Sequence, residues 1–220
     1  MIKFEKTETW GFEHAIRGMR NPMNSWEKSD SDFGGDGVVI GDNDLNLMKR
    51  LIKAGTTHRK FLRQIFVSVD ITAPLYWYKE FETYKVGTTS NSCSTMHKIH
   101  AKEFTKDDFS FEYLGKFGEG IIEDILEALN EARYVYNNFD ALTAKNELAE
   151  GATKKNTWYS MIQLLPSSYN QKRTVTMSYE NILNMLETRR GHKLDEWRQF
   201  CEWAMKLPYA AEIFSDYISL

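Results

Sequence analysis

The residues from Ile65 to Thr83, IFVSVDITAPLYWYKEFET, carry the clearest structural pattern of this chain. Apolar and polar side chains alternate from Ile65 to Thr72, and this period of two predicts a half-buried strand. Pro74 then suits the first turn of a helix, which we expect to run to about Phe81. A strand that leads directly into a helix indicates a fold that mixes sheet and helices.

Two further strands are predicted, because Ile2–Thr9 and Arg173–Met177 also show strand-like alternation. The other ordered segments place apolar residues at helical spacing. We therefore expect an α+β fold, with a small central sheet flanked by long helices. The predicted helices are Phe12–Met19, the segment between Asn43 and Gly55, Glu119–Ala144, Trp158–Leu165, Tyr179–Arg190 and Leu194–Lys206.

Two segments have the composition of loops. Asn21–Asp42 holds Pro22, four glycines and several Ser and Asp residues, which predicts a long mobile loop of the kind that often covers a site. The helix after it is expected to use Asp42 or Asn43 as its cap. Thr83–Thr95 has no helical period and is dense in hydroxyl groups, so we expect a second loop there.

The length of 220 residues suits one domain, which we expect to span residues 1–220. The hydrophobic and charged fractions are ordinary for a globular protein. A formal net charge of −3 argues against wrapping a nucleic acid polymer. The sequence has no internal repeat or linker that would divide the chain.

Cellular location follows from what the sequence lacks. No apolar run approaches the ~18–20 residues of a membrane span, and the first residues lack the apolar segment of a signal peptide. Cys93 and Cys201 form neither a CxxC motif nor a disulfide framework. We therefore expect a cytoplasmic protein with no membrane contact. His97 and His100 lack a nearby Asp or Cys ligand, so no metal site is expected.

Two windows of the chain resemble the flavin-dependent thymidylate synthases. Residues 47–98 run as a helix, a turn, a strand ending in Ala73-Pro74, a helix and a polar loop. Residues 165–189 begin with Leu-Pro, continue as a strand and close with a helix ending in Thr188-Arg189. The two windows cover about a third of the chain. The resemblance implies the family's α+β fold.

The family signature, R-H-R-x-x-S-x-N-E-x-S-x-R, is altered in this chain. Its positively charged positions are neutral here except for Lys85, and the upstream His-x-x-x-x-Glu element appears as His58 and Arg63. In the second window Glu180 stands at an expected basic position. The aligned residues are Thr83, Tyr84 and Lys85 for Arg-His-Arg, Thr88 for Ser, Ser90 and Asn91 for Asn-Glu, Cys93 for the second Ser and Thr95 for the last Arg.

The resemblance implies FAD, reduced nicotinamide (NADPH), dUMP and a methylene-tetrahydrofolate donor, bound at subunit interfaces of a homotetramer. In this interpretation reduced flavin delivers a hydride and dUMP is methylated to dTMP. The residues expected to hold the cofactor are Asn184, Arg189, Lys85, Thr88, Ser90 and Asn91. Those expected to hold the nucleotide are Ser92, Cys93, Ser94, Thr95 and Arg189. His58 and Tyr84 are the candidates for proton transfer.

The residues themselves are consistent with this view. A phosphate needs cations, helix N-termini or a concave nest of N–H and O–H donors, and the hydroxyl-rich loop with Gly87 can supply such a nest. Asn181, Asn184 and Thr188 form one polar stripe on their helix. The aromatic cluster Tyr76, Trp77, Tyr78 and Phe81 can stack on a ring system.

Simpler interpretations remain open at each place. The hydroxyl-rich loop can be solvated, with its hydroxyls capping turns. The polar stripe suits a solvated helix face, Arg189 suits a helix C-terminus, and the aromatic residues suit core packing. Cys93 is a nucleophile or an inert small residue. The lost arginines also leave two other functions open: a non-catalytic or repurposed nucleotide-binding protein, or an enzyme that modifies another pyrimidine nucleotide.

Overall fold

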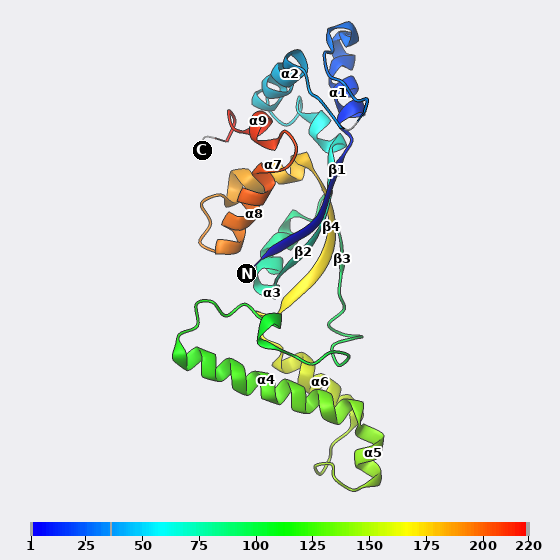
Figure 1. Cartoon of the computed structure of the whole chain (residues 1–220), viewed down its shortest axis with the longest axis vertical. Helices are drawn as coiled ribbons and strands as arrows, with labels where there is room; N and C mark the ends of the chain where they lie inside the picture. The colour runs from blue at the N-terminus through cyan, green and yellow to red at the C-terminus, as the bar shows by residue number, and fades with distance from the viewer. Residues whose placement is uncertain (1, 36, 219–220) are drawn as a thin grey trace. The chain divides into compact units, whose positions relative to one another are not determined.

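The computed structural model describes residues 2–35 and 37–218 (Figure 1). The chain divides into two compact units. Unit 1 comprises Thr72–Tyr78 and Ser92–Lys172, and unit 2 comprises Ile2–Ile71, Lys79–Asn91 and the residues from Arg173 onward. That residues 1–220 act as one domain stays a prediction.

The strands form one four-stranded antiparallel sheet in the order β1-β2-β4-β3 (Figure 1). In β2, Val67, Val69 and Ile71 are completely buried and their neighbours are half-buried, so the alternation in the sequence predicted this strand correctly. Both central strands, β2 and β4, bury alternate residues, whereas the edge strand β3 is exposed throughout. The bounds are β1 Lys3–Trp10, β2 Phe66–Pro74, β3 Thr89–Ser92 and β4 Asn170–Ser178.

Strand β3 corrects the sequence prediction, because it lies inside Thr83–Thr95, which was predicted to be all loop. Its four residues are polar and show no apolar alternation. The strand forms because it pairs with β4. Just past the strand, the backbone N–H of Cys93 donates to the carbonyl of Lys172 at 2.9 Å. A short edge strand of this kind is specified by its neighbour and not by its own pattern.

Unit 2 packs helices around large buried aromatic side chains. Trp197 and Phe200 from α8 and Tyr179 from α7 are fully buried. Phe4 on β1 stacks on Trp203 of α8 with ring centroids 4.6 Å apart. The helices with residues in this unit are α1 Phe12–Arg20, α2 Asp42–Lys53, part of α3 Leu75–Phe81, α7 Tyr179–Arg189, α8 Asp195–Met205 and α9 Ala210–Phe214.

The segment Asn21–Asp42 is tied down by the buried carboxylate of Asp44. Asp44 accepts hydrogen bonds from Arg20 Nε at 2.6 Å and from the hydroxyls of Ser29 and Ser31 at 2.7 Å each. The segment also contains two short 3-10 helices, at Asn21–Met23 and Trp26–Lys28. The loop is therefore folded around a buried ion pair, Arg20–Asp44, and is not free to move as predicted.

The start of α2 is capped by a distant residue. The carboxylate of Asp30 accepts from the backbone N–H groups of Asn43 at 2.9 Å and Asp44 at 3.1 Å. The prediction that Asp42 or Asn43 caps the helix is wrong, because the side chain that satisfies the free N–H groups comes from the preceding loop. The same carboxylate thereby fixes the loop to the helix.

In unit 1, α6 lies alongside α4 (Figure 1). The single helix predicted for Glu119–Ala144 is interrupted at Asn138, whose φ of −109° and ψ of 14° leave the helical region. Its side-chain amide donates to the carbonyl of Tyr134 at 2.8 Å, a local hydrogen bond that competes with helix continuation. The three helices are α4 Lys116–Asn137, α5 Phe139–Ala144 and α6 Lys154–Leu164.

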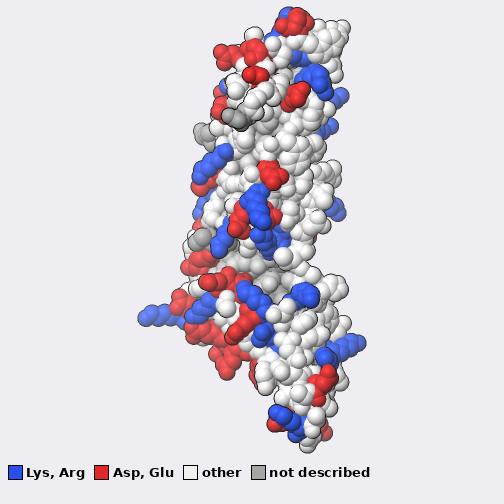
Figure 2. All heavy atoms as spheres, turned by 45° about the vertical axis from the view of Figure 1, so that its right-hand side comes forward, with Lys and Arg blue, Asp and Glu red and all other residues white. Residues whose placement is uncertain are grey.

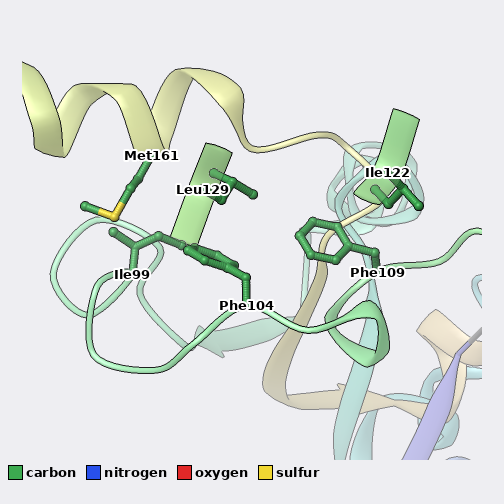
Figure 3. Close-up of a cluster of buried hydrophobic side chains, with 6 residues drawn as sticks. All are labelled: Ile99, Phe104, Phe109, Ile122, Leu129 and Met161. Carbon is green, nitrogen blue, oxygen red and sulfur yellow. The ribbon is translucent and has the colours of Figure 1, made fainter. Parts of the chain in front are cut away.

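A hydrophobic core of its own holds unit 1 together (Figure 3). Leu129 from α4 and Met161 from α6 are completely buried and meet side chains of the long connection that precedes α4. The core cluster comprises Ile99, Phe104, Phe109, Ile122, Leu129 and Met161.

The described residues contain neither a candidate membrane span nor a cluster of metal ligands. No helix in the described ranges is long and apolar enough to cross a bilayer. Within residues 2–35 and 37–218, no three His, Cys, Asp or Glu side chains are grouped so that they could hold a metal ion.

Candidate ligand pocket beside helix α7

Helix α7 carries the polar residues that the sequence singled out, and its start is fixed by a capping box. Ser178 Oγ accepts from the backbone N–H of Asn181 at 3.3 Å, and Asn181 Oδ1 accepts from the backbone N–H of Ser178 at 3.2 Å. This reciprocal pair satisfies two backbone donors and sets the direction in which the helix leaves β4. The faces presented by Glu180 and Asn184 follow from it.

Arg59 is the centre of a buried charge cluster on α7. Its guanidinium donates from Nε to Glu180 at 3.2 Å, from Nη1 to Glu187 at 3.3 Å and from Nη2 to Asn184 Oδ1 at 3.1 Å. Burial lowers the pKa of Arg59, but the two carboxylates outweigh it and the pKa is raised overall. The guanidinium therefore stays charged, and each of its three nitrogen atoms donates a hydrogen bond to a side chain of α7.

Sequence reasoning missed Arg59. The sequence did indicate a cation near α7, because Glu180 and Glu187 lie seven residues apart on that helix and so share a face. Two carboxylates on one helix face, one of them buried, favour a nearby cation. Nothing local to residue 59 indicated that Arg59, and not a neighbouring base such as Lys60 or Arg63, would supply it.

A cavity of about 530 Å³ opens beside this cluster in unit 2. Its wall includes Glu180, which is only 6% exposed and whose Oε2 has no hydrogen-bond partner among the described residues. Arg63 is exposed on the same wall, and Phe66 is half-buried there. The cavity thus offers a buried acceptor, a cation and an aromatic ring. Its remaining lining residues are Thr56, Val86, Gly87, Ser178, Asn181 and Asn184.

One edge of the cavity is a turn whose backbone conformation favours glycine. Gly87 has a φ of +78°, and a Cβ atom there would lie 3.1 Å from Asn181 Oδ1. Asn181 Nδ2 donates to the carbonyl of Val86 at 2.7 Å and ties this turn to α7. Thr88 Oγ1 donates back to the carbonyl of Tyr84 at 2.9 Å. The hydroxyl of Thr88 therefore stabilises the turn itself.

Arg189 is held in a second cluster at the end of α7. Its Nη1 lies 2.8 Å from Glu80 Oε2, and its Nε donates to the hydroxyl of Tyr84 at 2.8 Å. The guanidinium also lies over the rings of Tyr84 and Trp197, at 5.4 and 4.9 Å. Thr188 Oγ1 is 2.6 Å from the same Tyr84 hydroxyl. Arg189 is not among the residues that line the α7 cavity.

The polar stripe of α7 therefore faces partners within unit 2. Asn181 contacts Val86, Asn184 contacts Arg59, and Thr188 contacts Tyr84. The stripe is not an ordinary solvated face.

The other predicted residues lie in different surroundings. Lys85, Ser90 and Asn91 are exposed in unit 2. His58 is exposed on the wall of a separate cavity of about 550 Å³, so it and Tyr84 do not line a common pocket. Phe81 packs against Trp197 and Phe200, in agreement with the core interpretation of the aromatic cluster.

The residues expected to hold the nucleotide belong to unit 1, apart from Arg189. Ser92 and Cys93 are exposed, and Thr95 is half-buried. The backbone carbonyl of Cys93 accepts from Gln171 Nε2 at 2.7 Å. Ser94 Oγ accepts from the backbone N–H groups of Met96 and His97 at 3.1 and 3.0 Å, which stabilises a turn.

Comparison with known proteins identifies the fold. No protein-family model matches the chain, and no curated protein sequence matches it. Solved structures do match, and the class they define is the flavin-dependent thymidylate synthase fold, as the resemblance in the sequence implied.

Two such structures are similar over nearly their whole length. One is thymidylate synthase X (ThyX) from Helicobacter pylori with FAD and dUMP, with a TM-score of 0.64, 17% identity and 100% of both chains covered. Another is the flavin-dependent ThyX of the same organism, complexed with FAD and dUMP, with a TM-score of 0.63, 18% identity and 98% of both chains covered. At this identity the likeness establishes the fold, because one fold hosts many functions.

Proposed function

We propose that this chain, as one ThyX-like domain over residues 1–220, binds FAD and a pyrimidine deoxynucleotide, with the flavin ring entering the α7 cavity. The unpartnered Oε2 of the buried Glu180 carries the proposal, because a buried carboxylate oxygen without a donor is costly. A ring N–H group is the donor that a flavin offers. The FAD and dUMP bound to the two ThyX structures support the ligand class.

The cavity fits the ring end of FAD better than its phosphate end. Phe66 offers an apolar surface to a ring, and the amide of Asn184 lies on the same wall as Glu180. A pyrophosphate would place more negative charge beside the carboxylate oxygen Oε2 of Glu180, which has no hydrogen-bond donor among the described residues. The phosphates therefore belong at the exposed Arg63 and at Lys85, which precedes Val86 on the cavity wall. We place the ring inward and the phosphates at the mouth.

In the enzyme form of the proposal, reduced flavin supplies the hydride for methylation of dUMP to dTMP. The chain's own residues bind and orient: Glu180 accepts a ring N–H, Phe66 excludes water from one ring surface, and Arg63 pairs with phosphate. Methylene-tetrahydrofolate and NADPH are the co-substrates of this form. We further propose a cytoplasmic homotetramer with sites at its subunit interfaces.

A second candidate is a non-catalytic, repurposed nucleotide-binding protein. It is favoured by the two internal ion pairs Arg59–Glu180 and Arg189–Glu80, which neutralise arginines that would otherwise be free to bind phosphate. An arginine already held by a carboxylate must break that pair before it can bind an anion. The scaffold would then be retained for binding or assembly.

The experiment compares FAD with riboflavin, which lacks the phosphates. Purified protein is titrated with each flavin, and flavin fluorescence is followed. We expect Arg63→Ala to weaken FAD about tenfold and to leave riboflavin unchanged, since one charge-assisted hydrogen bond is lost. Lys60→Ala, an exposed neighbour outside the cavity, is the matched control.

The outcomes separate the two candidates. Binding of neither flavin to the wild-type chain would overturn the proposal. Flavin binding together with dTMP formation from dUMP, methylene-tetrahydrofolate and NADPH establishes the enzyme. Flavin binding without dTMP establishes the repurposed protein.

A further inference from the structure

We propose that unit 1 carries a second ligand site, which binds a small aromatic phosphomonoester through Lys154, Lys155 and His97, with its ring against Trp158. These residues line a cavity of about 390 Å³ together with Met96 and Tyr136. None of them belongs to the α7 cavity or to the signature positions. The site stands independently of the flavin proposal.

Two cations line this cavity. Lys154 and Lys155 are the first residues of α6, and both are exposed. Their Nζ atoms lie over the rings of Tyr136 at 5.7 Å and Tyr159 at 5.9 Å. The positive end of the α6 dipole adds to their field, so a dianionic phosphate is favoured there.

One acidic group competes for these lysines. Asp140 Oδ2 lies 3.6 Å from Lys154 Nζ, but the aspartate side chain is 90% exposed. An exposed pair of this kind is held weakly and is screened by salt. A phosphate with two charges can therefore displace it.

The aromatic wall is fixed before any ligand arrives. Trp158 Nε1 donates to the carbonyl of Met96 at 3.0 Å, and its ring stands at 79° to Tyr159 with centroids 4.9 Å apart. Tyr136 packs against His100 with centroids 4.7 Å apart. A ring held in one orientation loses little freedom when a ligand stacks on it.

The hydrophobic core supports both walls (Figure 3). Met161, one turn after Trp158 on α6, and Leu129, two turns before Tyr136 on α4, are completely buried in that cluster. The turn with Met96 and His97 is held by Ser94 Oγ. The site therefore lies on rigid elements and is not an accidental gap between loops.

The surroundings select a small ligand over a polyanion. Between Ser92 and Lys172 the chain has twelve Asp and Glu residues against nine Lys and Arg residues. Acidic side chains gather in the lower part of the molecule in Figure 2. Glu119, Glu123 and Asp124 of α4 are all exposed. A nucleic acid strand, with its many phosphates, would be disfavoured by this excess of acidic side chains. A monoester such as phenyl phosphate or a mononucleotide would not.

Calorimetric titration of the full chain with phenyl phosphate, dUMP, deoxyuridine and inorganic phosphate tests the site. We expect the two esters to bind. Deoxyuridine, which lacks the phosphate, and inorganic phosphate, which lacks the ring, should each bind at least about tenfold more weakly. The two esters distinguish a general aromatic monoester site from a nucleotide site. Only the dUMP binding that is lost in the Lys154→Ala, Lys155→Ala double variant is assigned to this site, because the proposed function already gives the chain a site for a pyrimidine deoxynucleotide. A large preference for dUMP in that part of the binding indicates a nucleotide site, and similar affinities for the two esters indicate a general monoester site.

The variants locate the binding. Lys154→Ala with Lys155→Ala is expected to weaken both esters about tenfold or more, whereas Lys145→Ala, an exposed lysine of the same unit outside the cavity, leaves them unchanged. Trp158→Leu should weaken the esters more than inorganic phosphate. Equal affinities in the double variant and the wild-type chain overturn the proposal, as does tighter binding of a single-stranded oligonucleotide than of dUMP. The Arg63→Ala variant should bind the esters normally, which separates this site from the flavin pocket.

Discussion

Arg59 and Glu180 form an ion pair with Nε and Oε1 3.2 Å apart, and each side chain is less than a tenth exposed. Glu180 stands where the resemblance to the flavin-dependent thymidylate synthases implies a base. From the sequence alone, the acid at this position indicated the loss of a basic residue that would contact the ligand. The structure instead shows that a cation from another part of the chain compensates for the acid, so the charge pattern around α7 is rearranged and remains paired.

Removing Arg59 should destabilise the fold. In Arg59→Gln the carboxylates of Glu180 and Glu187 lose their cation, and the ring of Tyr217 loses the guanidinium 5.4 Å from its centroid. We expect the free energy of unfolding in urea to fall by about 3 kcal/mol, because a buried charge is left without its partner. Lys60→Gln, its exposed neighbour, should change it by less than about 0.5 kcal/mol. Equal stability of the two variants would show that the pair contributes nothing.

The sequence predicted the regular elements well because they follow periodic patterns. The alternation of Val67, Val69 and Ile71 and the helical stripes of α1, α2, α7 and α8 marked elements that the structure confirms. The sequence patterns did not predict strand β3 or the cap of α2, because both depend on partners that are remote in the chain. Asp30 reaches α2 from the preceding loop, and β3 depends on β4.

The candidate site was less predictable, because side-chain pairing depends on tertiary structure. Asn184 was correctly expected to matter on α7 and lies on the cavity wall, yet its partner Arg59 comes from 125 residues away. Arg189 was expected to hold a ligand, whereas the structure pairs it with Glu80. A residue's type gives the chemistry that it can perform, but its neighbours decide whether that chemistry is available.

Asp44 should make the free energy of unfolding decrease at low pH. Burial raises the pKa of its carboxyl group, but the hydrogen bonds from Ser31, Ser29 and Arg20 outweigh this and hold the pKa below its ordinary value of 3.8. The stabilisation is therefore fully present above the ordinary value and is lost as pH falls through the lowered folded value. We expect Asp44→Asn to lose about 3 kcal/mol at pH 7 and to show a flatter stability profile below about pH 4.

Urea unfolding at several pH values measures this profile. Asp42→Asn is the matched control, since Asp42 is an exposed carboxylate in the first turn of the same helix. If the acid limb of the profile were as steep in Asp44→Asn as in the wild-type chain, another group would be responsible for it.

Gly11 should tolerate no side chain. Its φ is +100°, and an added Cβ would lie 2.1 Å from the carbonyl oxygen of Gln64, which belongs to the backbone and cannot rotate away. Gly11→Ala is therefore expected to lower the free energy of unfolding by about 2–3 kcal/mol or to prevent folding. Gly191→Ala is the control, because Gly191 has open space around it and no positive φ, so we expect a change within about 0.5 kcal/mol.

Tyr84 gives the sharpest test of a sequence-based role. Its hydroxyl group lies 2.6 Å from Thr188 Oγ1 and accepts from Arg189 Nε at 2.8 Å, whereas the resemblance made it a candidate for proton transfer. In Tyr84→Phe we expect a loss of about 1 kcal/mol of stability, because the hydroxyl group supports Arg189. FAD affinity should be unchanged, because Tyr84 does not line the α7 cavity.

If the chain forms dTMP, the pH dependence of the reaction rate of Tyr84→Phe separates the two roles. A positioning residue leaves the pH profile of the reaction in place, whereas loss of a proton-transfer group removes one limb of it. Urea unfolding, flavin titration and the pH dependence of dTMP formation, measured on the same preparation, decide between them.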